Sequence, residues 1–366
     1  MTSRDNTFDE ILARLQVSEG YDSARTGDAS ESRLIGLDSN ENYFADAALI
    51  RKMAGEASRC DFRVYPREEM IELREKLGAW LHIEPECVVL ANGEDQVIDL
   101  AATVLLREGS AISISPTYSM YRLRLELIGG RLIQVPLMKD FSLDVPRLLS
   151  VADESHAPIM FLCSPNNPTA NQFSEASIVQ VLSRYRGLVV LDEAYAEFAE
   201  RSLVSLVREY SNLAVIRTFS KAFGIAGARL GYMIANPQLS KILAEKAQLP
   251  YPISRFTARL GIECLRNLKA MQDSVRKMKR ERSWVIDRLR RIERLRVFDS
   301  ETNFVFFCTG QNSSKISAKL RSLGVSVRDF GNVLDLRGCL RVTVGTRLMS
   351  EKFLGALEEV MRDEQL

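Results

Sequence analysis

A single lysine, Lys221, stands among small residues in RTFSKAFGIAGARLGY (217–232), directly after the apolar run LAVI. Lysine is normally a surface residue, because burying an ammonium group costs several kcal/mol. If its pKa were lowered, its amine could form an imine. Thr218, Ser220 and Arg229 supply two hydroxyls and a guanidinium, groups that hold a phosphate dianion. Taken alone, the segment is more typical of an ordinary exposed lysine than of a reactive one.

A carboxylate closes a second apolar run. In LVVLDEAY, Asp192 lies at the carboxyl end of an expected buried strand, where open α/β sheets place their ligands. A protonated pyridine nitrogen would be a suitable partner, because the ion pair keeps the ring able to accept electrons from a carbanion. Tyr195 could donate a hydrogen bond to a phenolate oxygen of such a ring. The alternative is a structural Asp192 that caps a helix.

A third apolar run, in FLCSPNNPTA (161–170), ends in a turn. Pro165 and Pro168 restrict the backbone, so the amide of Asn167 is held in one position. Asn167 is therefore a second candidate donor to the phenolate oxygen. Asn-Pro is also ordinary turn chemistry, so a plain turn remains an alternative.

Two more segments could complete a ligand site. VVLANGEDQVIDL predicts a strand, a glycine turn and a helix that begins near Glu94, where the free N–H groups of Glu94 and Asp95 could bind a phosphate. In SPTYSMY, the ring of Tyr118 could stack on a flat heterocycle. A simple Asn-Gly turn and a packed tyrosine are the alternatives.

The elements that must position these residues follow from the apolar pattern. Between about Cys60 and Asn236, strand-like runs alternate with helical patterns: CVVLA, AISIS, LIQVP, IMFLC, LVVLD, AVIRT and LGYMIA. This alternation predicts an α/β domain on a mainly parallel, buried sheet.

The rest of the chain predicts a smaller α+β domain. Residues 254–295 have helical periodicity and form a bridging helix or a pair of helices, and NFVFFC, VSVRDF and LRVTVG predict strands after them. We expect an N-terminal arm at 1–30, a small domain at 31–60 and 254–366, and a large ligand-binding domain at 61–253. The basic run 276–296 contains acidic residues and no aromatic platform, which favours a solvated helix face over a nucleic-acid surface.

The composition narrows the class of protein. The chain has 366 residues, 46% of them hydrophobic, which is enough to bury a sizeable core. This length is too great for one small domain and favours two domains. Lys plus Arg number 49 against 48 Asp plus Glu, so we expect neither nucleic acid nor a membrane as a partner. The polar N-terminus lacks the apolar core of a secretory signal, and no stretch is long enough to span a bilayer, so we expect a cytoplasmic protein.

The cysteines and histidines indicate a reducing compartment and no metal site. The six cysteines form no Cys-x-x-Cys pair, and several lie in apolar runs, so we interpret them as buried free thiols: Cys60, Cys87, Cys163, Cys264, Cys308 and Cys339. The two histidines, His82 and His156, lie outside any cluster with metal-ligand spacing. We therefore expect no metal.

In this order and spacing, the segments resemble the fold-type I pyridoxal-phosphate aminotransferases. Within that group they most resemble the histidinol-phosphate aminotransferases, which belong to class II. SKAFGIAGAR, from Ser220 to Arg229, reproduces the S-K-A-F-x-x-A-G-x-R pattern around that family's cofactor lysine. The resemblance covers nearly the whole chain. It implies pyridoxal 5'-phosphate as cofactor and a large domain with a mainly parallel seven-stranded sheet beside a smaller α+β domain.

The resemblance also implies a role for each candidate. Lys221 carries the cofactor as a Schiff base, Asp192 binds the pyridine nitrogen, and Tyr118 stacks on the ring. Asn167 and Tyr195 bind the phenolic oxygen. The cofactor phosphate is assigned to the following groups: Thr218, Ser220, Arg229, the amides of Glu94 and Asp95, and Tyr65 of RVYPRE from the neighbouring subunit of a homodimer.

Substrate recognition is implied for three residues. GYDSAR at 20–25 resembles the family's N-terminal arm, whose tyrosine, here Tyr21, contacts the substrate. Arg328 and Arg341 resemble the arginine pair that holds a substrate phosphate or a carboxylate of 2-oxoglutarate, and two fixed guanidiniums suit both anions. Ala170, where the family has glycine, and Tyr43, where it often has proline, depart from the pattern. Ala170 bears on the backbone of its turn, because a non-glycine residue resists positive φ.

The implied reaction transfers an amino group between L-histidinol phosphate and 2-oxoglutarate, giving imidazole-acetol phosphate and glutamate in histidine biosynthesis. Lys221 then serves as both tether and general base. Three alternatives remain: an aromatic amino-acid aminotransferase, a threonine-phosphate decarboxylase and a binding module of the same fold. The last would leave Lys221 and Asp192 without evident use.

Overall fold

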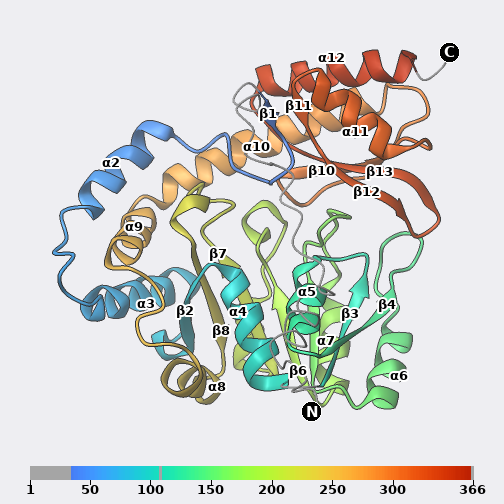
Figure 1. The fold of residues 1–366 in the computed structure, drawn as a ribbon. Helices are drawn as coiled ribbons and strands as arrows, with labels where there is room; N and C mark the ends of the chain where they lie inside the picture. Colours follow the sequence, from blue (N-terminus) through green and yellow to red (C-terminus); the bar gives the residue numbers. More distant parts are fainter. Residues whose placement is uncertain (1–33, 107–108, 364–366) are drawn as a thin grey trace, which may run out of the picture.

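The seven expected strands form one sheet. The computed structural model describes residues 34–106 and 109–363 (Figure 1). The strands are β2 (Val88–Asn92), β3 (Ser110–Ser115), β4 (Arg131–Pro136), β5 (Ile159–Cys163), β6 (Leu188–Asp192), β7 (Leu213–Thr218) and β8 (Leu230–Ala235). Their order is β2-β8-β7-β6-β5-β3-β4, in which β8 is antiparallel to both neighbours and the other pairs are parallel. The predicted mainly parallel sheet is confirmed.

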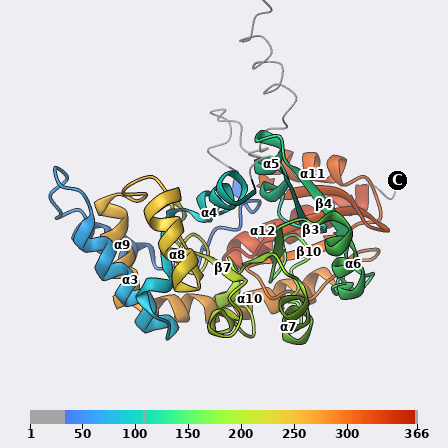
Figure 2. The same ribbon diagram turned by 90° about the horizontal axis from the view of Figure 1, so that it is seen from below.

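Helices cover both faces of this sheet, as the view from below shows (Figure 2). They include α4 (Glu94–Leu100) and α5 (Met120–Leu127) on one face, and α6 (Val145–Ser155) and α7 (Glu175–Arg184) on the other. Successive strand residues point to opposite faces, so Val190 packs with Val97 of α4 while Leu191 joins the cluster of Val181 of α7. Each such side chain stabilises the fold by roughly 1.5–3 kcal/mol when fully buried.

A second, smaller sheet accounts for the expected C-terminal strands. Its order is β12 (Arg328–Val333), β13 (Leu336–Thr343), β10 (Phe304–Cys308) and β9 (Arg296–Val297). Helices α11 (Ser313–Ser322) and α12 (Arg347–Asp363) lie over this part of the chain (Figure 1). The short β1 (Ile35–Gly36) pairs in parallel with β11 (Val325–Ser326), which ties the first described residues to the C-terminal part. The smaller α+β unit is thus present, and the boundaries at residues 60 and 254 stay a prediction.

The segment 254–295 is a pair of helices. It contains α9 (Arg255–Arg266) and α10 (Leu268–Leu289), and α10 runs from α9 to beneath α12 (Figure 1). The other helices in the described part of the chain are α2 (Ala47–Ala57), α3 (Arg67–Leu81) and α8 (Pro237–Ile242). Short 3-10 or π turns lie at 85–87, 101–106, 196–198, 204–208, 226–228 and 243–247. The inward face of α10 buries Met271, Val275 and Met278, while Arg276 and Lys277 are exposed. Most basic residues of the run therefore lie on the outside, as expected of a solvated helix face. Arg282 is the exception, since it is buried and donates to the carbonyl of Thr302 at 2.7 Å.

The prediction of six free thiols is wrong for one pair. Cys60, Cys87, Cys163 and Cys264 are free and buried, whereas Cys308 and Cys339 form a disulfide. The reason is the strand register: Cys308 of β10 lies directly opposite Cys339 of β13, and opposed residues of an antiparallel pair have adjacent side chains. Spacing in the sequence gives no indication of this register.

Both histidines lie at the end of a helix. His82 ends α3 and His156 ends α6, each in the left-handed conformation that allows the last carbonyls of a helix to be capped. Within residues 34–106 and 109–363, no group of three or more His, Cys, Asp or Glu side chains is arranged to hold a metal ion. In the same ranges, no helix has both the length and the apolar character needed to cross a bilayer.

Candidate active site

One recess collects most of the expected site residues. It lies where the carboxyl ends of β5, β6 and β7 meet β13 and the first described loop, and its volume is about 440 Å³. The residues that line it are Ser39, Asn40, Glu94, Tyr118, Cys163, Asn167, Asp192, Ala194, Tyr195, Lys221 and Arg341. The parallel strands place their carboxyl ends at one edge of the sheet, which explains why segments far apart in the chain meet here.

Asp192 is buried at the end of β6 and is held by two donors. The Tyr121 hydroxyl donates to its Oδ2 at 2.6 Å, and the Ala194 N–H donates to its Oδ1 at 3.0 Å. Burial raises the pKa of Asp192 to about 6, although the hydrogen bond from Tyr121 opposes the rise. At pH 7 and above the carboxylate is therefore ionised and suited to a cationic partner.

Lys221 follows β7 on the loop 219–225 and is half-buried. Its Nζ donates to the carbonyl of Ser39 at 3.3 Å and lies 5.9 Å from the centre of the Tyr195 ring. Burial lowers the pKa of Lys221, the Glu94 carboxylate opposes that shift, and the Arg341 guanidinium adds to it. A lowered pKa increases the neutral fraction of the amine, which is the form that attacks carbonyl carbon and accepts protons.

A cluster of phosphate-type donors lies beside the lysine loop. Thr218 and Ser220 are buried, and their hydroxyl oxygens are 3.0 Å apart. Arg229 adopts a left-handed conformation with φ of 50°, and its Nη2 donates to Asp95 Oδ2 at 3.1 Å. The Tyr118 hydroxyl donates to Asp95 Oδ1 at 3.1 Å, so Asp95 links the expected ring-stacking residue to the guanidinium.

Two glycines allow these parts to come together. A Cβ on Gly93, whose φ is +76°, would lie 2.6 Å from Arg229 Nη2. A Cβ on Gly231 would lie 2.6 Å from the amide nitrogen of Glu94. A side chain at Gly231 would push apart the start of α4 and the start of β8, because these are backbone contacts. One at Gly93 would displace the Arg229 guanidinium and would have to adopt a positive φ.

The amide and hydroxyl expected at the phenolic oxygen both face the recess. Arg341 Nη1 donates to Asn167 Oδ1 at 2.6 Å, which leaves the Asn167 amide nitrogen as the donor end. The Tyr195 hydroxyl accepts from Asn40 Nδ2 at 2.9 Å, and burial raises the pKa of Tyr195. Both groups can therefore act as neutral hydrogen-bond donors.

The two expected substrate arginines are neighbours across the small sheet. Arg328 of β12 is directly opposite Arg341 of β13 in the antiparallel register, so their side chains project from the same face. Arg341 lines the recess, where the rings of Phe304 and Phe330 lie 5.1 and 5.6 Å from its guanidinium carbon. Two like charges side by side favour an anion between or above them.

Six expected residues of the described part do not line the recess: Asp95, Thr218, Ser220 and Arg229 near the lysine loop, Arg328 opposite Arg341, and Tyr65. Tyr65 is 68% exposed, and its ring stacks on that of Tyr251 with 4.4 Å between centroids. Tyr21 and the N-terminal arm at 1–30 lie outside the described residues. Of the two departures, Ala170 is buried with φ of 66°, in the left-handed region. The Tyr43 hydroxyl lies 2.7 Å from Glu41 Oε2.

Sequence reasoning missed several residues that support the site. Tyr121, Asn40 and Cys163 contact or line it, and only Tyr121 had a usable signal, since it lies one helical turn beyond Tyr118. Beneath the lysine loop, buried Arg217 pairs with Glu193 at 2.9 Å and with Glu197 at 2.7 Å. These ion pairs raise the pKa of Arg217 despite its burial, and they connect β7 to the loop after β6.

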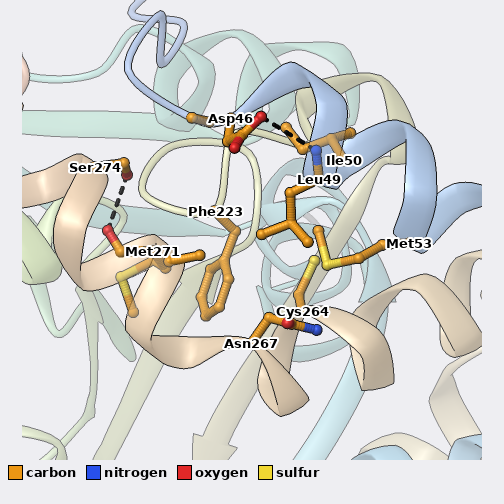
Figure 3. A pocket seen from close by; sticks show the side chains of 11 residues that line it. Asp46, Leu49, Ile50, Met53, Phe223, Cys264, Asn267, Met271 and Ser274 are labelled. Atoms are coloured by element: carbon orange, nitrogen blue, oxygen red, sulfur yellow. Dashed lines mark hydrogen bonds between the residues drawn. The ribbon is translucent and has the colours of Figure 1, made fainter.

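A second recess lies behind the lysine loop (Figure 3). It lies between α2, α9 and α10, and the side chains of Leu49, Met53, Phe223 and Met271 form its apolar wall. Asp46, the carboxylate among its lining residues, accepts hydrogen bonds from the first amides of α2. It is a packing cavity, because its lining has no cation to oppose that carboxylate.

The donor set fits pyridoxal phosphate. The start of α4 presents the amides of Glu94 and Asp95 with no side-chain cap among the described residues, and Arg229, Thr218 and Ser220 lie beside it. A phosphate ester matches these donors, while the carboxylate of Asp192 matches a pyridinium nitrogen at the other end. Lys221 lies on the same recess, where it can meet a carbonyl group.

This sheet, with a lysine after β7 and an aspartate at the end of β6, is that of a fold-type I pyridoxal-phosphate enzyme. The chain belongs to the family "Aminotransferase class I and II", whose model matches residues 32–357.

Similar proteins with an assigned name belong to the same class of enzyme. The chain is 31% identical to a histidinol-phosphate aminotransferase of Caldanaerobacter subterraneus subsp. tengcongensis, over 89% of this chain and 92% of the relative. It is 33% identical to the protein of the same name from Cytophaga hutchinsonii, over 96% and 99%. The fold matches the crystal structure of histidinol-phosphate aminotransferase from Sinorhizobium meliloti in complex with pyridoxal-5'-phosphate. That match has a TM-score of 0.86 at 24% identity and covers 96% of this chain and 97% of the other.

Proposed function

We propose that the protein is a pyridoxal-phosphate-dependent aminotransferase that acts on L-histidinol phosphate and 2-oxoglutarate in histidine biosynthesis. The products are imidazole-acetol phosphate and glutamate. Relatives that carry the name histidinol-phosphate aminotransferase support this assignment over nearly the full chain. The structural observation that carries it is the opposed pair Arg328 and Arg341 beside the recess of Lys221, because both partners of the reaction are anions.

The chain's own residues would hold the cofactor at three points. Asp192 would pair with the ring nitrogen, Asn167 and Tyr195 would bind the phenolic oxygen, and Tyr118 would lie against the ring. The phosphate would be bound by Thr218, Ser220, Arg229 and the amides of Glu94 and Asp95. When bound, the cofactor supplies an electron sink for a carbanion at the substrate α-carbon.

Lys221 would carry the proton in the central step. Its Nζ would take the proton from the substrate α-carbon and deliver it to the C4′ carbon of the cofactor. The amino group would thereby be transferred from the substrate to the cofactor. The lowered pKa of Lys221 favours this role, because the base must be neutral before it accepts the proton. Arg328 and Arg341 would orient the anionic group of each substrate, and Tyr21 of the expected N-terminal arm would contact the substrate.

We propose a homodimer in which Tyr65 reaches the phosphate of the other subunit. Tyr65 lies outside the recess of its own chain, on a loop that exposes apolar side chains. Phe62 is 67% exposed, Val64 is 53% exposed, and Leu249, two residues before Tyr251, is 76% exposed. An exposed apolar group of this kind is typical of a surface that is covered by another chain. We also propose that the reaction takes place in the cytoplasm, which the four buried free thiols favour and the Cys308–Cys339 disulfide does not.

The absorption spectrum of the cofactor-loaded protein and of Lys221→Ala tests the proposal, with one substrate added and no keto acid. L-Histidinol phosphate should convert the wild-type band to that of the amine form at micromolar concentrations. Equal conversion by L-phenylalanine would instead make the enzyme a broader aromatic aminotransferase. Release of carbon dioxide from L-threonine phosphate would make it a decarboxylase. A band that does not depend on Lys221 would refute the whole assignment.

A further inference from the structure

The side chain of Glu94 is not among the groups proposed to hold the cofactor. Its amide faces the phosphate position, but its carboxyl group also lines the recess together with Asp192 and Lys221. Glu94 Oε2 is buried and has no hydrogen-bond partner among the described residues. An ionised carboxylate with one oxygen left this way is unfavourable, because neither water nor a donor compensates the charge on that oxygen.

The charges around Glu94 come from several elements. The groups that act on it or face the same recess are Asp95 on α4, Asp192 on β6, Lys221 after β7, Arg229 before β8, Tyr118 and Tyr121 by α5, Cys163 on β5 and Arg341 on β13. Burial raises the pKa of Glu94 to about 8, Asp192 and Asp95 add to the rise, and Lys221 and Arg229 oppose it. The Arg229 guanidinium is already paired with Asp95, which limits its help to Glu94.

A bound cofactor would strengthen this preference for the neutral form. It brings a phosphate dianion and a phenolic oxygen into a recess that already holds the carboxylate of Asp192. A second carboxylate would repel these groups, whereas a carboxylic acid offers an O–H donor to an anionic oxygen.

We propose that Glu94 binds the cofactor as a neutral carboxylic acid, so that cofactor binding by this protein is coupled to the uptake of one proton from solvent. This inference rests on the proposed cofactor of the preceding section. Above the pKa of Glu94 in the free protein, binding must first protonate Glu94, and the affinity falls with pH. Below that pKa the proton is already present, and this contribution to the pH dependence disappears.

Pyridoxamine 5'-phosphate is the suitable probe, because it binds without forming a covalent bond to Lys221. Its dissociation constant would be measured with the full-length chain by equilibrium dialysis from pH 6 to pH 10. Glu94→Gln keeps the backbone amide and mimics the neutral carboxyl group. Glu75→Gln, on the exposed side of α3, is the matched control.

The wild-type to Glu94→Gln ratio of dissociation constants should be constant below pH 7 and rise about tenfold between pH 7 and pH 9, while Glu75→Gln follows wild type. Calorimetry at pH 9, in two buffers of different ionisation enthalpy, should show about one more proton taken up by wild type than by Glu94→Gln. The difference from the variant is the test, because the ring nitrogen of the probe also takes up a proton when it pairs with Asp192. Glu94→Ser, which likewise has no carboxyl group, replaces Glu94→Gln if that variant does not fold.

A ratio that does not change with pH would overturn the inference, as would equal proton uptake by wild type and Glu94→Gln at pH 9. Either result would mean that Glu94 turns away from the bound cofactor or stays ionised beside it. If the probe fails to bind wild type at every pH, the proposed cofactor itself is wrong. The two failures are therefore distinguishable.

Discussion

The Tyr121 hydroxyl donates a 2.6 Å hydrogen bond to Oδ2 of Asp192, and both groups are buried. This bond opposes the effect of burial on the Asp192 carboxyl group, whose pKa is about 6. Tyr121 is itself fixed by the ring of Phe161, which stacks on it at 5.0 Å between centroids. Tyr121 is therefore a positioning residue for the carboxylate expected to pair with the cofactor nitrogen.

Tyr121→Phe should shift the pH dependence of cofactor binding. Loss of a hydrogen bond to a charged group, worth about 1.5–3 kcal/mol, should raise the pKa of Asp192 by about one to two units. The binding of the protonated cofactor ring requires ionised Asp192, so affinity falls as pH decreases through this pKa. In Tyr121→Phe that fall should begin at higher pH, as measured by cofactor titration between pH 5 and 8. Tyr185→Phe, which removes a hydroxyl bonded to the carbonyl of Ala157, should leave the profile unchanged.

Arg341→Lys should impair substrate binding more than cofactor binding. An ammonium group cannot reproduce the fork that contacts Asn167 and the carbonyl of Asp38 while leaving a face for an anion. We expect KM for the amino phosphate to rise about 10- to 100-fold, the equivalent of one charged hydrogen bond. Steady-state kinetics at saturating cofactor checks this. Arg337→Lys, an exposed change on the same strand, is the control, and equal effects of the two would contradict a substrate role for Arg341.

Glu193→Ala should strongly destabilise the fold. It leaves Arg217 buried with a single carboxylate, Glu197, and it removes acceptors for Ser202 and Leu203. Breaking a buried ion pair by removing one partner costs about 3–5 kcal/mol. Urea unfolding would measure the loss. Glu56→Ala breaks an exposed pair with Arg59 and should change the free energy of unfolding by less than about 1 kcal/mol.

Mixed dimers should reveal which subunit supplies Tyr65. Lys221→Ala and Tyr65→Ala chains, unfolded together and refolded, should recover activity in the mixed species, because one of its two sites then has both native residues. Random pairing should restore about a quarter of wild-type activity. Each variant refolded alone gives the background. If Tyr65 serves the site of its own chain, mixing adds nothing to that background.

Thiol counting tests the disulfide across β10 and β13. Protein purified without reductant and denatured should react at four cysteines, and at all six after reduction. Cys339→Ser should add one reactive thiol, that of Cys308, before reduction. Six thiols in the unreduced wild type would show that the opposed pair remains in the thiol form.

Much of the site could be predicted because its residues follow apolar strand runs. Asp192, Asn167 and Lys221 each come at or just after the end of a buried strand, and the ends of parallel strands meet at one edge of the sheet. The pattern therefore predicts both the sheet and the proximity of these side chains. The backbone at Ala170 could not be predicted in this way, since it is left-handed with φ of 66° although alanine does not favour that conformation.

Contacts between distant segments could not be predicted in this way. Tyr121 is 71 positions from Asp192, and nothing local indicates that its hydroxyl turns toward that carboxylate. The pairing of Cys308 with Cys339, and of Arg328 with Arg341, depends on the register of β13 with its neighbours, where a shift of one residue would reverse the faces.

The sequence by itself therefore determined the order of the elements and the chemistry of the site residues, because periodicity and residue type are local properties. Tertiary structure alone decided the charge states. The pKa of Glu94 near 8 depends on burial and on Asp192, Asp95, Lys221 and Arg229, which come from four different segments. Electrostatic interactions act through space, so only the folded chain can show which groups a carboxyl group faces.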